Sequence, residues 1–136
     1  MSNTRQQLPP KQTLRLILFP LLGTFGCQRL YLHFVRVQHI YPGGHLVHHL
    51  FLGVLIVIPA AFLLAFGTRL RLLAISARVG LGIGSAMILD EIAYLVVTKA
   101  TDQDYVSSVS LYGAIAFISV AVVFLWILYE ADRGRT

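Results

Sequence analysis

The chain has 136 residues, of which 57% are hydrophobic and only 12% are charged. A soluble domain carries about 25% charged residues, so this composition excludes an ordinary soluble protein. The formal net charge of +5 raises the question of nucleic acid. The basic residues flank apolar segments, however, which favours membrane orientation and anionic lipid and argues against a nucleic-acid partner. The single cysteine, Cys27, excludes an intrachain disulfide and a cysteine-based zinc site.

Four apolar segments fill most of the length, and each is long enough to cross a bilayer, which takes about 20 apolar residues. They cover about residues 14–35, 46–68, 79–98 and 106–129. Polar tails precede and follow them, at residues 1–13 and 130–136. The sequence therefore predicts one membrane domain over residues 14–129, with an all-α fold: a four-helix transmembrane bundle.

The first apolar segment changes character half-way along. Its second half carries Arg29, His33 and Arg36 at i, i+4 and i+7, one stripe of a helix. A charge near the bilayer centre costs ~2.5–3.5 kcal/mol or more, so the stripe should face the bundle or the interface. A cleaved secretory signal is the rival interpretation, but Thr24 and the bulky Phe25 are poor matches to a lipoprotein cleavage site.

Lysine and arginine are distributed unevenly over the connections. Three of them, Arg29, Arg36 and Lys99, lie on one side of the expected membrane. Eight lie on the other side, with the two tails and the connection after the second segment: Arg5, Lys11, Arg15, Arg69, Arg71, Arg78, Arg133 and Arg135. Because cytoplasmic loops carry the excess of basic residues, both termini are predicted to be cytoplasmic.

A glycine-rich run opens the third apolar segment. Its spacing is wrong for a dinucleotide-binding fingerprint, and no strand precedes it. Gly80 and Gly84 instead form a small-xxx-small face, which lets transmembrane helices approach closely. The third segment is therefore expected to pack tightly against a neighbour.

A histidine cluster opens the second apolar segment. His45, His48 and His49 follow a Pro-Gly-Gly turn, and their spacing places them on one face of a helix. Two adjacent carboxylates, Asp90 and Glu91, lie deep in the third segment. At 1.5 Å per residue, Glu91 lies about 10 Å below the outer end of its helix and His49 roughly 6 Å below the start of its own. These depths predict that imidazoles and carboxylates meet near the outer face.

The two carboxylates need compensation, because an ionised carboxylate in an apolar segment is costly. Asp90 and Glu91 are about 100° apart around the helix, so at most one points at the centre of a site. Arg29, the histidines, a cation or protonation would supply the compensation. Tyr94, at i+4 from Asp90, is placed to donate a hydrogen bond.

The first interpretation of this cluster is a metal site. Imidazoles with a carboxylate suit a divalent or transition metal such as Zn, Fe or Mn. The expected ligands are His45, His48 and His49 with Asp90 or Glu91. The residues expected to orient these ligands or to bind an anion are Arg29, His33, Arg36 and Tyr94. Such a site would run metal-assisted chemistry on a lipid-like substrate reached from the bilayer.

Three other interpretations stay open. In the second, Arg29, His33 and Arg36 grip a phosphate while the carboxylate and histidines act as acid and base on a lipid. The third is a carrier of protons or ions, in which intramembrane His, Asp and Glu form a relay, and four spans would need to form a homo-oligomer. In the fourth, Arg29 and Asp90 neutralise each other in a structural or accessory membrane protein.

These motifs together resemble a known group. The element His45-x-x-His48-His49-x-x-x-Gly53 and the glycine-rich run ending in Asp90-Glu91 are similar to an uncharacterised family of small bacterial four-helix integral membrane proteins. The likeness covers about Arg29 to Tyr112. It implies the four-helix architecture, a bacterial plasma (inner) membrane and a polar site, but no reaction. Membrane lipids are the partners expected from the apolar spans and their basic flanks.

Overall fold

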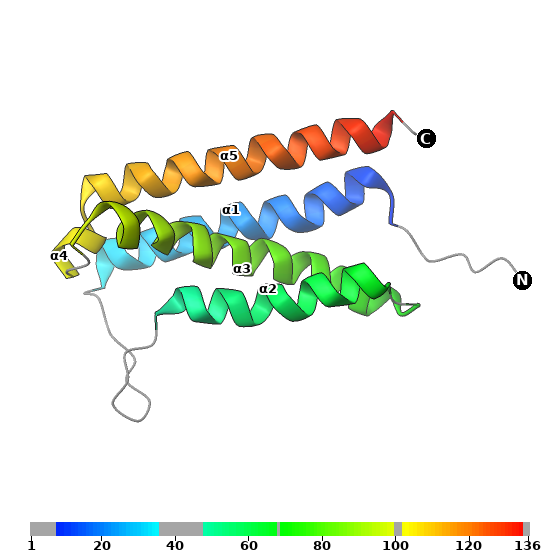
Figure 1. Cartoon of the computed structure of the whole chain (residues 1–136), viewed down its shortest axis with the longest axis horizontal. Helices are drawn as coiled ribbons and strands as arrows, with labels where there is room; N and C mark the ends of the chain where they lie inside the picture. The colour runs from blue at the N-terminus through cyan, green and yellow to red at the C-terminus, as the bar shows by residue number, and fades with distance from the viewer. Residues whose placement is uncertain (1–7, 36–47, 68, 100–101, 135–136) are drawn as a thin grey trace, which may run out of the picture.

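The computed structural model describes residues 8–35, 48–67, 69–99 and 102–134. Every regular element in these ranges is helical, and the helices are α1 (Pro10–Phe34), α2 (His49–Phe66), α3 (Arg71–Val97), α4 (Asp102–Tyr105) and α5 (Ser108–Arg133). The four long helices run alongside one another, and the short helix α4 leads from α3 into α5 (Figure 1). The predicted all-α bundle is therefore confirmed.

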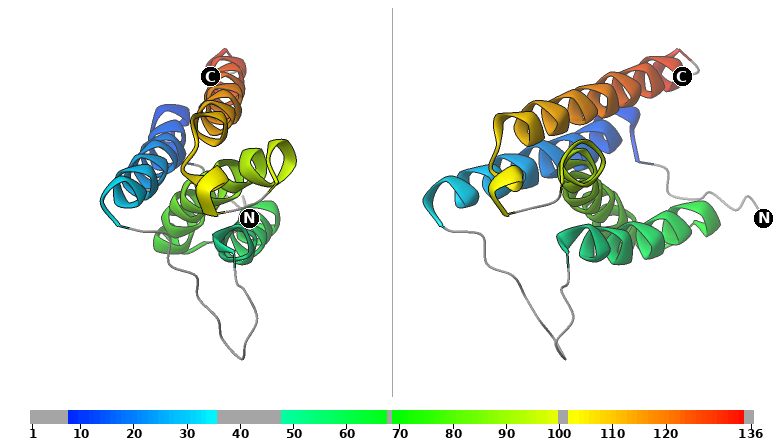
Figure 2. Two further views of the ribbon diagram at one scale, coloured as in Figure 1. Left: turned by 90° about the vertical axis from the view of Figure 1, so that its left-hand side faces the viewer. Right: turned by 60° about the vertical axis from the view of Figure 1, so that its left-hand side comes forward.

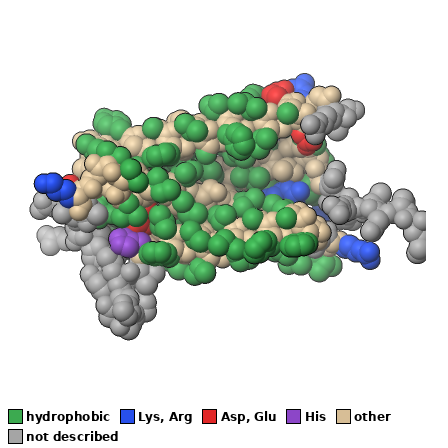
Figure 3. All heavy atoms as spheres, viewed as in Figure 1, with side chains coloured by type: hydrophobic (Ala, Val, Ile, Leu, Met, Phe, Trp, Pro, Cys, Tyr) green, Lys and Arg blue, Asp and Glu red, His purple; other side chains and the backbone are tan. Residues whose placement is uncertain are grey.

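The outer surface is that of a membrane protein. In the described ranges α2, α3 and α5 are long and apolar enough to cross a membrane, with mean hydropathies of 2.5, 1.8 and 2.5. Large apolar side chains cover the sides of the bundle (Figure 3). Helix α1 is not among these three, because Gln28, Arg29 and His33 interrupt its apolar sequence. That α1 also crosses the membrane therefore stays a prediction from the sequence.

Helix α3 occupies the middle of the bundle. Helices α1, α2 and α5 all pack against it, as the end-on view in Figure 2 shows. Its buried residues are mostly small: Ala74, Ala77, Gly82, Gly84, Ala86 and Ala93, together with Asp90, Glu91 and Tyr94. Small side chains let neighbouring backbones approach closely, which is how transmembrane helices gain packing energy. The carboxylates are thereby carried on the most enclosed helix.

Glycines of α3 bring two neighbouring helices very close, α2 at Gly84 and, closer still, α1 at Gly82. A Cβ atom added at Gly84 would lie 2.6 Å from the carbonyl oxygen of Gly53, and one added at Gly53 would lie 2.7 Å from that of Gly84. Gly82 meets α1 in the same way, at the Ile17 carbonyl. Gly80 is less crowded, since its added Cβ would lie 3.3 Å from the Ile56 side chain. The predicted close approach thus occurs at Gly84, against a glycine of α2.

The starts of α3 and α2 differ from the predicted starts of the third and second spans. Helix α3 begins at Arg71, before the predicted start of the third span at residue 79, so Arg78 lies inside the helix. Helix α2 begins at His49, with His48 as its N-cap residue in an extended conformation. His48 and His49 therefore lie at the N-terminal end of α2.

We predict that Gly84→Ala destabilises the bundle. The added methyl group meets the Gly53 backbone, and such overpacking costs about 1–3 kcal/mol. Thermal unfolding of the detergent-solubilised protein, followed by circular dichroism, measures the effect. Gly23→Ala is the matched control, because an added Cβ there meets nothing within 4 Å, and its midpoint should match or exceed that of wild type. Equal midpoints for the two variants would contradict the close packing of α2 on α3.

Candidate functional site

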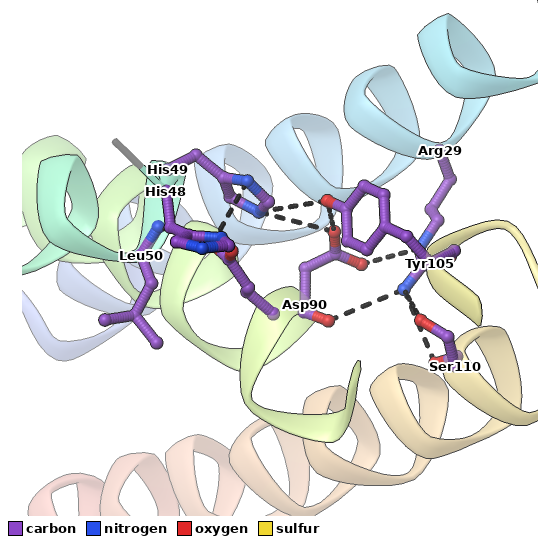
Figure 4. Close-up of polar contacts among 8 residues, drawn as sticks. Arg29, His48, His49, Leu50, Asp90, Tyr105 and Ser110 are labelled. Atoms are coloured by element: carbon purple, nitrogen blue, oxygen red, sulfur yellow. Dashed lines mark hydrogen bonds and ion pairs between the residues drawn. The ribbon is translucent and has the colours of Figure 1, made fainter. Parts of the chain in front are cut away.

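Polar side chains from all five described helices gather at one end of the bundle (Figure 4). The predicted carboxylates Asp90 and Glu91 are buried there, with 0% and 2% of their surfaces exposed. Figure 4 shows the other members around them: Arg29, His48, His49, Tyr105 and Ser110. The structure therefore brings imidazoles and carboxylates together from helices α2 and α3.

Arg29 uses all three of its guanidinium nitrogens inside the protein. Nε donates to Asp90 Oδ1 at 2.5 Å, and Nη1 donates to the carbonyl oxygen of Tyr105 at 3.2 Å. Nη2 donates to Ser110 Oγ at 3.2 Å and, at 3.4 and 3.5 Å, to the carbonyl oxygens of Ser110 and Asp90. One guanidinium group on α1 thus ties together α3, α4 and α5. Most of its N–H groups are thus used inside the protein, and the anion-binding role of the second interpretation stays a prediction.

Tyr105 is the hydrogen-bond donor to the second carboxylate oxygen of Asp90. Its hydroxyl group donates to Asp90 Oδ2 at 3.0 Å, and its ring packs edge-on against Tyr94, with centroids 4.9 Å apart. The Arg29 guanidinium lies 5.5 Å from the same ring. Burial, and then the negative charge of Asp90, raise the pKa of the Tyr105 hydroxyl above its ordinary value. Tyr105 therefore remains a hydrogen-bond donor.

Glu91 faces the other way, toward α2. Its Oε1 contacts His48 Nδ1, and its Oε2 accepts the backbone N–H of Leu50 at 2.7 Å. The first backbone N–H groups of a helix lack partners within that helix, and a negative charge is favourable beside them. Glu91 thus caps α2 from the neighbouring helix. In the described residues neither lysine nor arginine forms an ion pair with it.

His49 lies between the two carboxylates. Its Nδ1 is 3.2 Å from Glu91 Oε2, and its Nε2 is 3.6 Å from Asp90 Oδ2 and 3.2 Å from the Tyr105 hydroxyl oxygen. A neutral imidazole carries only one N–H group. Both ring nitrogens of His49 thus face oxygen atoms, and only one of them donates when the ring is neutral.

The cluster has an enclosed part and an accessible part. We call the enclosed part, which consists of Arg29, Asp90, Tyr105 and Ser110, the anchor. The accessible part consists of His48 and His49, whose side chains are 26% and 23% exposed, with Glu91 beneath them. Histidine side chains reach the surface beside acidic groups at this end of the molecule (Figure 3).

Of the remaining predicted site residues, His33 is not part of this cluster. His33 is exposed on α1 and packs edge-on against Phe34, with centroids 5.2 Å apart. His45 and Arg36 lie outside the described residues. Tyr105 and Ser110 belong to the site, although the sequence analysis did not single them out. The one indication in the sequence was that both residues lie near the start of the fourth apolar segment, on the side of the membrane where Asp90 was expected.

The contacts among the described residues do not support the predicted metal site. His48, His49 and Glu91 have suitable donor atoms. Across residues 8–35, 48–67, 69–99 and 102–134, however, no three His, Cys, Asp or Glu side chains are arranged so that they could hold a metal ion. The described residues therefore do not by themselves form a metal site, and a site built from His45, His48 or His49 with Asp90 or Glu91 stays a prediction.

Comparison of the chain with protein-family models, with curated proteins and with solved structures gives no match. The likeness to the bacterial family of four-helix membrane proteins therefore stays a prediction. What the site does has to be argued from its own geometry.

We predict strong energetic coupling between Arg29 and Asp90. Removing one member of a buried pair costs about 3–5 kcal/mol, because it leaves an uncompensated buried charge. Arg29→Leu and Asp90→Leu should each lower the unfolding midpoint strongly, and the double variant should be less destabilised than their sum. A double-mutant cycle from unfolding in detergent measures this coupling.

The control pair for this cycle is Glu130 and Arg133. Their closest atoms are 3.9 Å apart and their side chains are 45% and 67% exposed, so leucine variants of this pair should couple by at most about 1 kcal/mol. Additive effects at Arg29 and Asp90 would contradict the assignment of the anchor.

Proposed function

We propose that this membrane protein performs acid–base chemistry at His48 and Glu91, on a lipid-like substrate reached from the bilayer. One observation carries the proposal: the buried carboxylate of Glu91 holds Nδ1 of a histidine whose side chain is 26% exposed. A histidine oriented by a carboxylate through one ring nitrogen, with the other nitrogen accessible, is the usual general acid–base pair of enzymes.

Glu91 is well placed to orient the ring. Its second oxygen is fixed by the Leu50 N–H at 2.7 Å, so the carboxylate is held at the start of α2. When Nδ1–H of His48 donates to this carboxylate, the lone pair of the neutral ring resides on Nε2. In this state His48 Nε2 accepts a proton from a substrate hydroxyl group or from water and returns it in a later step.

The surroundings of His48 indicate an amphipathic substrate. His48 lies against Phe51, with ring centroids 6.5 Å apart, and Phe51 and Leu55 are 55% and 68% exposed on the adjoining face of α2. A lipid lying along this face would place its acyl chain on apolar side chains and its polar group at His48. The substrate class we infer is therefore a membrane lipid with a polar headgroup.

The anchor has a supporting role in this proposal. Arg29 fixes Asp90, and Asp90 precedes Glu91 on the same helix, so the anchor holds Glu91 in register with α2. We further propose that the site lies near the outer face of a bacterial inner membrane with both termini in the cytoplasm, following the distribution of lysine and arginine.

A proton or ion carrier is the second candidate function. It is favoured by His49, whose two ring nitrogens face the carboxylates of both Asp90 and Glu91. Histidine and carboxylate side chains inside membranes commonly form proton relays. A carrier would acidify or alkalinise liposomes that contain the purified protein and a pH-sensitive dye, and Glu91→Gln would abolish the response.

We predict that the purified protein converts a component of a bacterial polar lipid extract in mixed micelles, detected by mass spectrometry over time. His48→Gln and Glu91→Gln should lower the rate at least about 100-fold, since general acid–base catalysis contributes 10²–10⁴ in rate. His33→Gln is the control, because His33 is an exposed histidine that does not touch the cluster, and it should turn over at the wild-type rate. Equal rates in His48→Gln and His33→Gln would contradict the proposal.

Metal content is measured on the same preparations by elemental analysis, with His49→Ala and Glu91→Ala beside wild type. The acid–base proposal expects turnover to persist after treatment with a chelator. Turnover that is lost with the chelator and restored by Zn²⁺, Fe²⁺ or Mn²⁺ would favour the metal site predicted from the sequence. Absence of turnover, together with a dye response in liposomes, would favour the carrier.

A further inference from the structure

Arg78 is a charged residue inside a membrane-spanning helix, at the opposite end of α3 from the histidine–carboxylate cluster. It lies seven residues after Arg71, where α3 begins, which corresponds to about 10 Å of helix. Its side chain is partly buried between α3 and the start of α1. Such a position raises the question of what balances its charge.

The described part of the chain satisfies only some of the N–H groups of this guanidinium group. Nε donates to Thr13 Oγ1 at 3.2 Å, and Nη1 donates to the Ala74 carbonyl oxygen at 2.8 Å. Within the described ranges Nη2 has no hydrogen-bond partner, and no carboxylate forms an ion pair with Arg78. The buried carboxylates Asp90 and Glu91 are engaged at the other end of α3. The charge of Arg78 is therefore uncompensated by the described part of the chain.

The direction of the side chain shows where a counter-charge would come from. The bond to Ala74, four residues earlier, turns the guanidinium group back toward the start of α3. Long basic side chains near helix ends extend in this way toward the membrane interface, where lipid headgroups lie. The Arg78 guanidinium thus points to the level of the phosphate groups.

Other basic residues surround this end of the bundle. They come from the starts of α1 and α3 and the turn between α2 and α3: Lys11, Arg15, Arg69 and Arg71. Figure 3 shows basic side chains at this end, some of them set back in the recess between the helices. The local field therefore favours an anion beside Arg78.

We propose that Arg78 and Thr13 bind the phosphate group of an anionic phospholipid, in the leaflet that meets the start of α3. A guanidinium group donates to two phosphate oxygens at once through its planar array of N–H groups. The Thr13 oxygen accepts from Arg78, which leaves its own hydroxyl hydrogen to donate to the phosphate. The acyl chains lie against the apolar sides of α1 and α3. This site is independent of the acid–base function proposed for His48 and Glu91, because it lies at the other end of the molecule.

The test measures bound lipid on the purified, delipidated full-length protein by native mass spectrometry. Phosphatidylglycerol and phosphatidylcholine are added separately, and the fraction of protein carrying one lipid is compared. Wild type should retain phosphatidylglycerol at least about fivefold more strongly, because it carries a net negative charge, whereas the choline cation of phosphatidylcholine offsets its phosphate and is repelled by basic side chains. Arg78→Gln should retain the two lipids equally. Arg133→Gln is the control, because Arg133 is also basic and lies at the same end, but is 67% exposed and pairs with Glu130.

Four outcomes would overturn the proposal. If Arg78→Gln still prefers phosphatidylglycerol, Arg78 is not part of the site. If Arg133→Gln loses as much of the preference as Arg78→Gln does, the preference comes from general surface charge. A preference abolished by millimolar inorganic phosphate assigns the site to soluble phosphate instead of lipid. If Arg78→Gln does not fold, as judged by circular dichroism, Thr13→Val decides: it should weaken the preference several-fold, and an unchanged preference would refute the site.

Discussion

The ion pair between Arg29 and Asp90 is the interaction on which the architecture of this protein depends. Either charge alone would be costly in an apolar bundle, and the pair is acceptable because its donors and acceptors are almost fully used. Arg29 donates hydrogen bonds to α3, α4 and α5, and the Tyr105 hydroxyl group donates to the second carboxylate oxygen of Asp90. Asp90 and Glu91 are neighbours, so fixing the first also fixes the second. Their side chains leave α3 about 100° apart, which turns Asp90 toward α1, α4 and α5, and Glu91 toward α2.

Helix α2 depends on α3 for both its packing and its polar start. Gly53 and Gly84 bring the two backbones into contact, and Glu91 then accepts the Leu50 N–H at the beginning of α2. Apart from the buried Gly53 and Ala60, the residues of α2 are partly or fully exposed, and among the described helices α2 packs extensively only on α3. The position of His48 therefore follows from two features of α3, a glycine and a carboxylate, that lie about two turns apart.

Much of this arrangement follows from simple rules applied to the sequence. Hydropathy predicted the all-α membrane fold, and the rise per residue predicted that the histidines and carboxylates lie at the same depth. The Arg29–Asp90 pair was expected only as one of four interpretations. The hydrogen bond from Tyr105 to Asp90 could not be predicted, because the position of Tyr105 depends on how the four-residue helix α4 folds back over the bundle. Arg78 was assigned to a connection because its charge suggested a helix boundary, whereas it lies inside α3, where two of its guanidinium nitrogens bond to Ala74 of α3 and Thr13 of α1.

The contrast between the two carboxylates bears on function. Asp90 is paired with arginine, which is always charged and binds carboxylates through several N–H groups, so it is the best partner for a purely structural role. Glu91 is just as deeply buried, yet the imidazoles of His48 and His49 are its side-chain partners. Imidazole gains and loses a proton near neutral pH, so it compensates a carboxylate less reliably than arginine does. A chain under selection for stability alone would gain from a second arginine at this place. The use of partly exposed histidines at this place supports the proposed exchange of protons with a bound molecule.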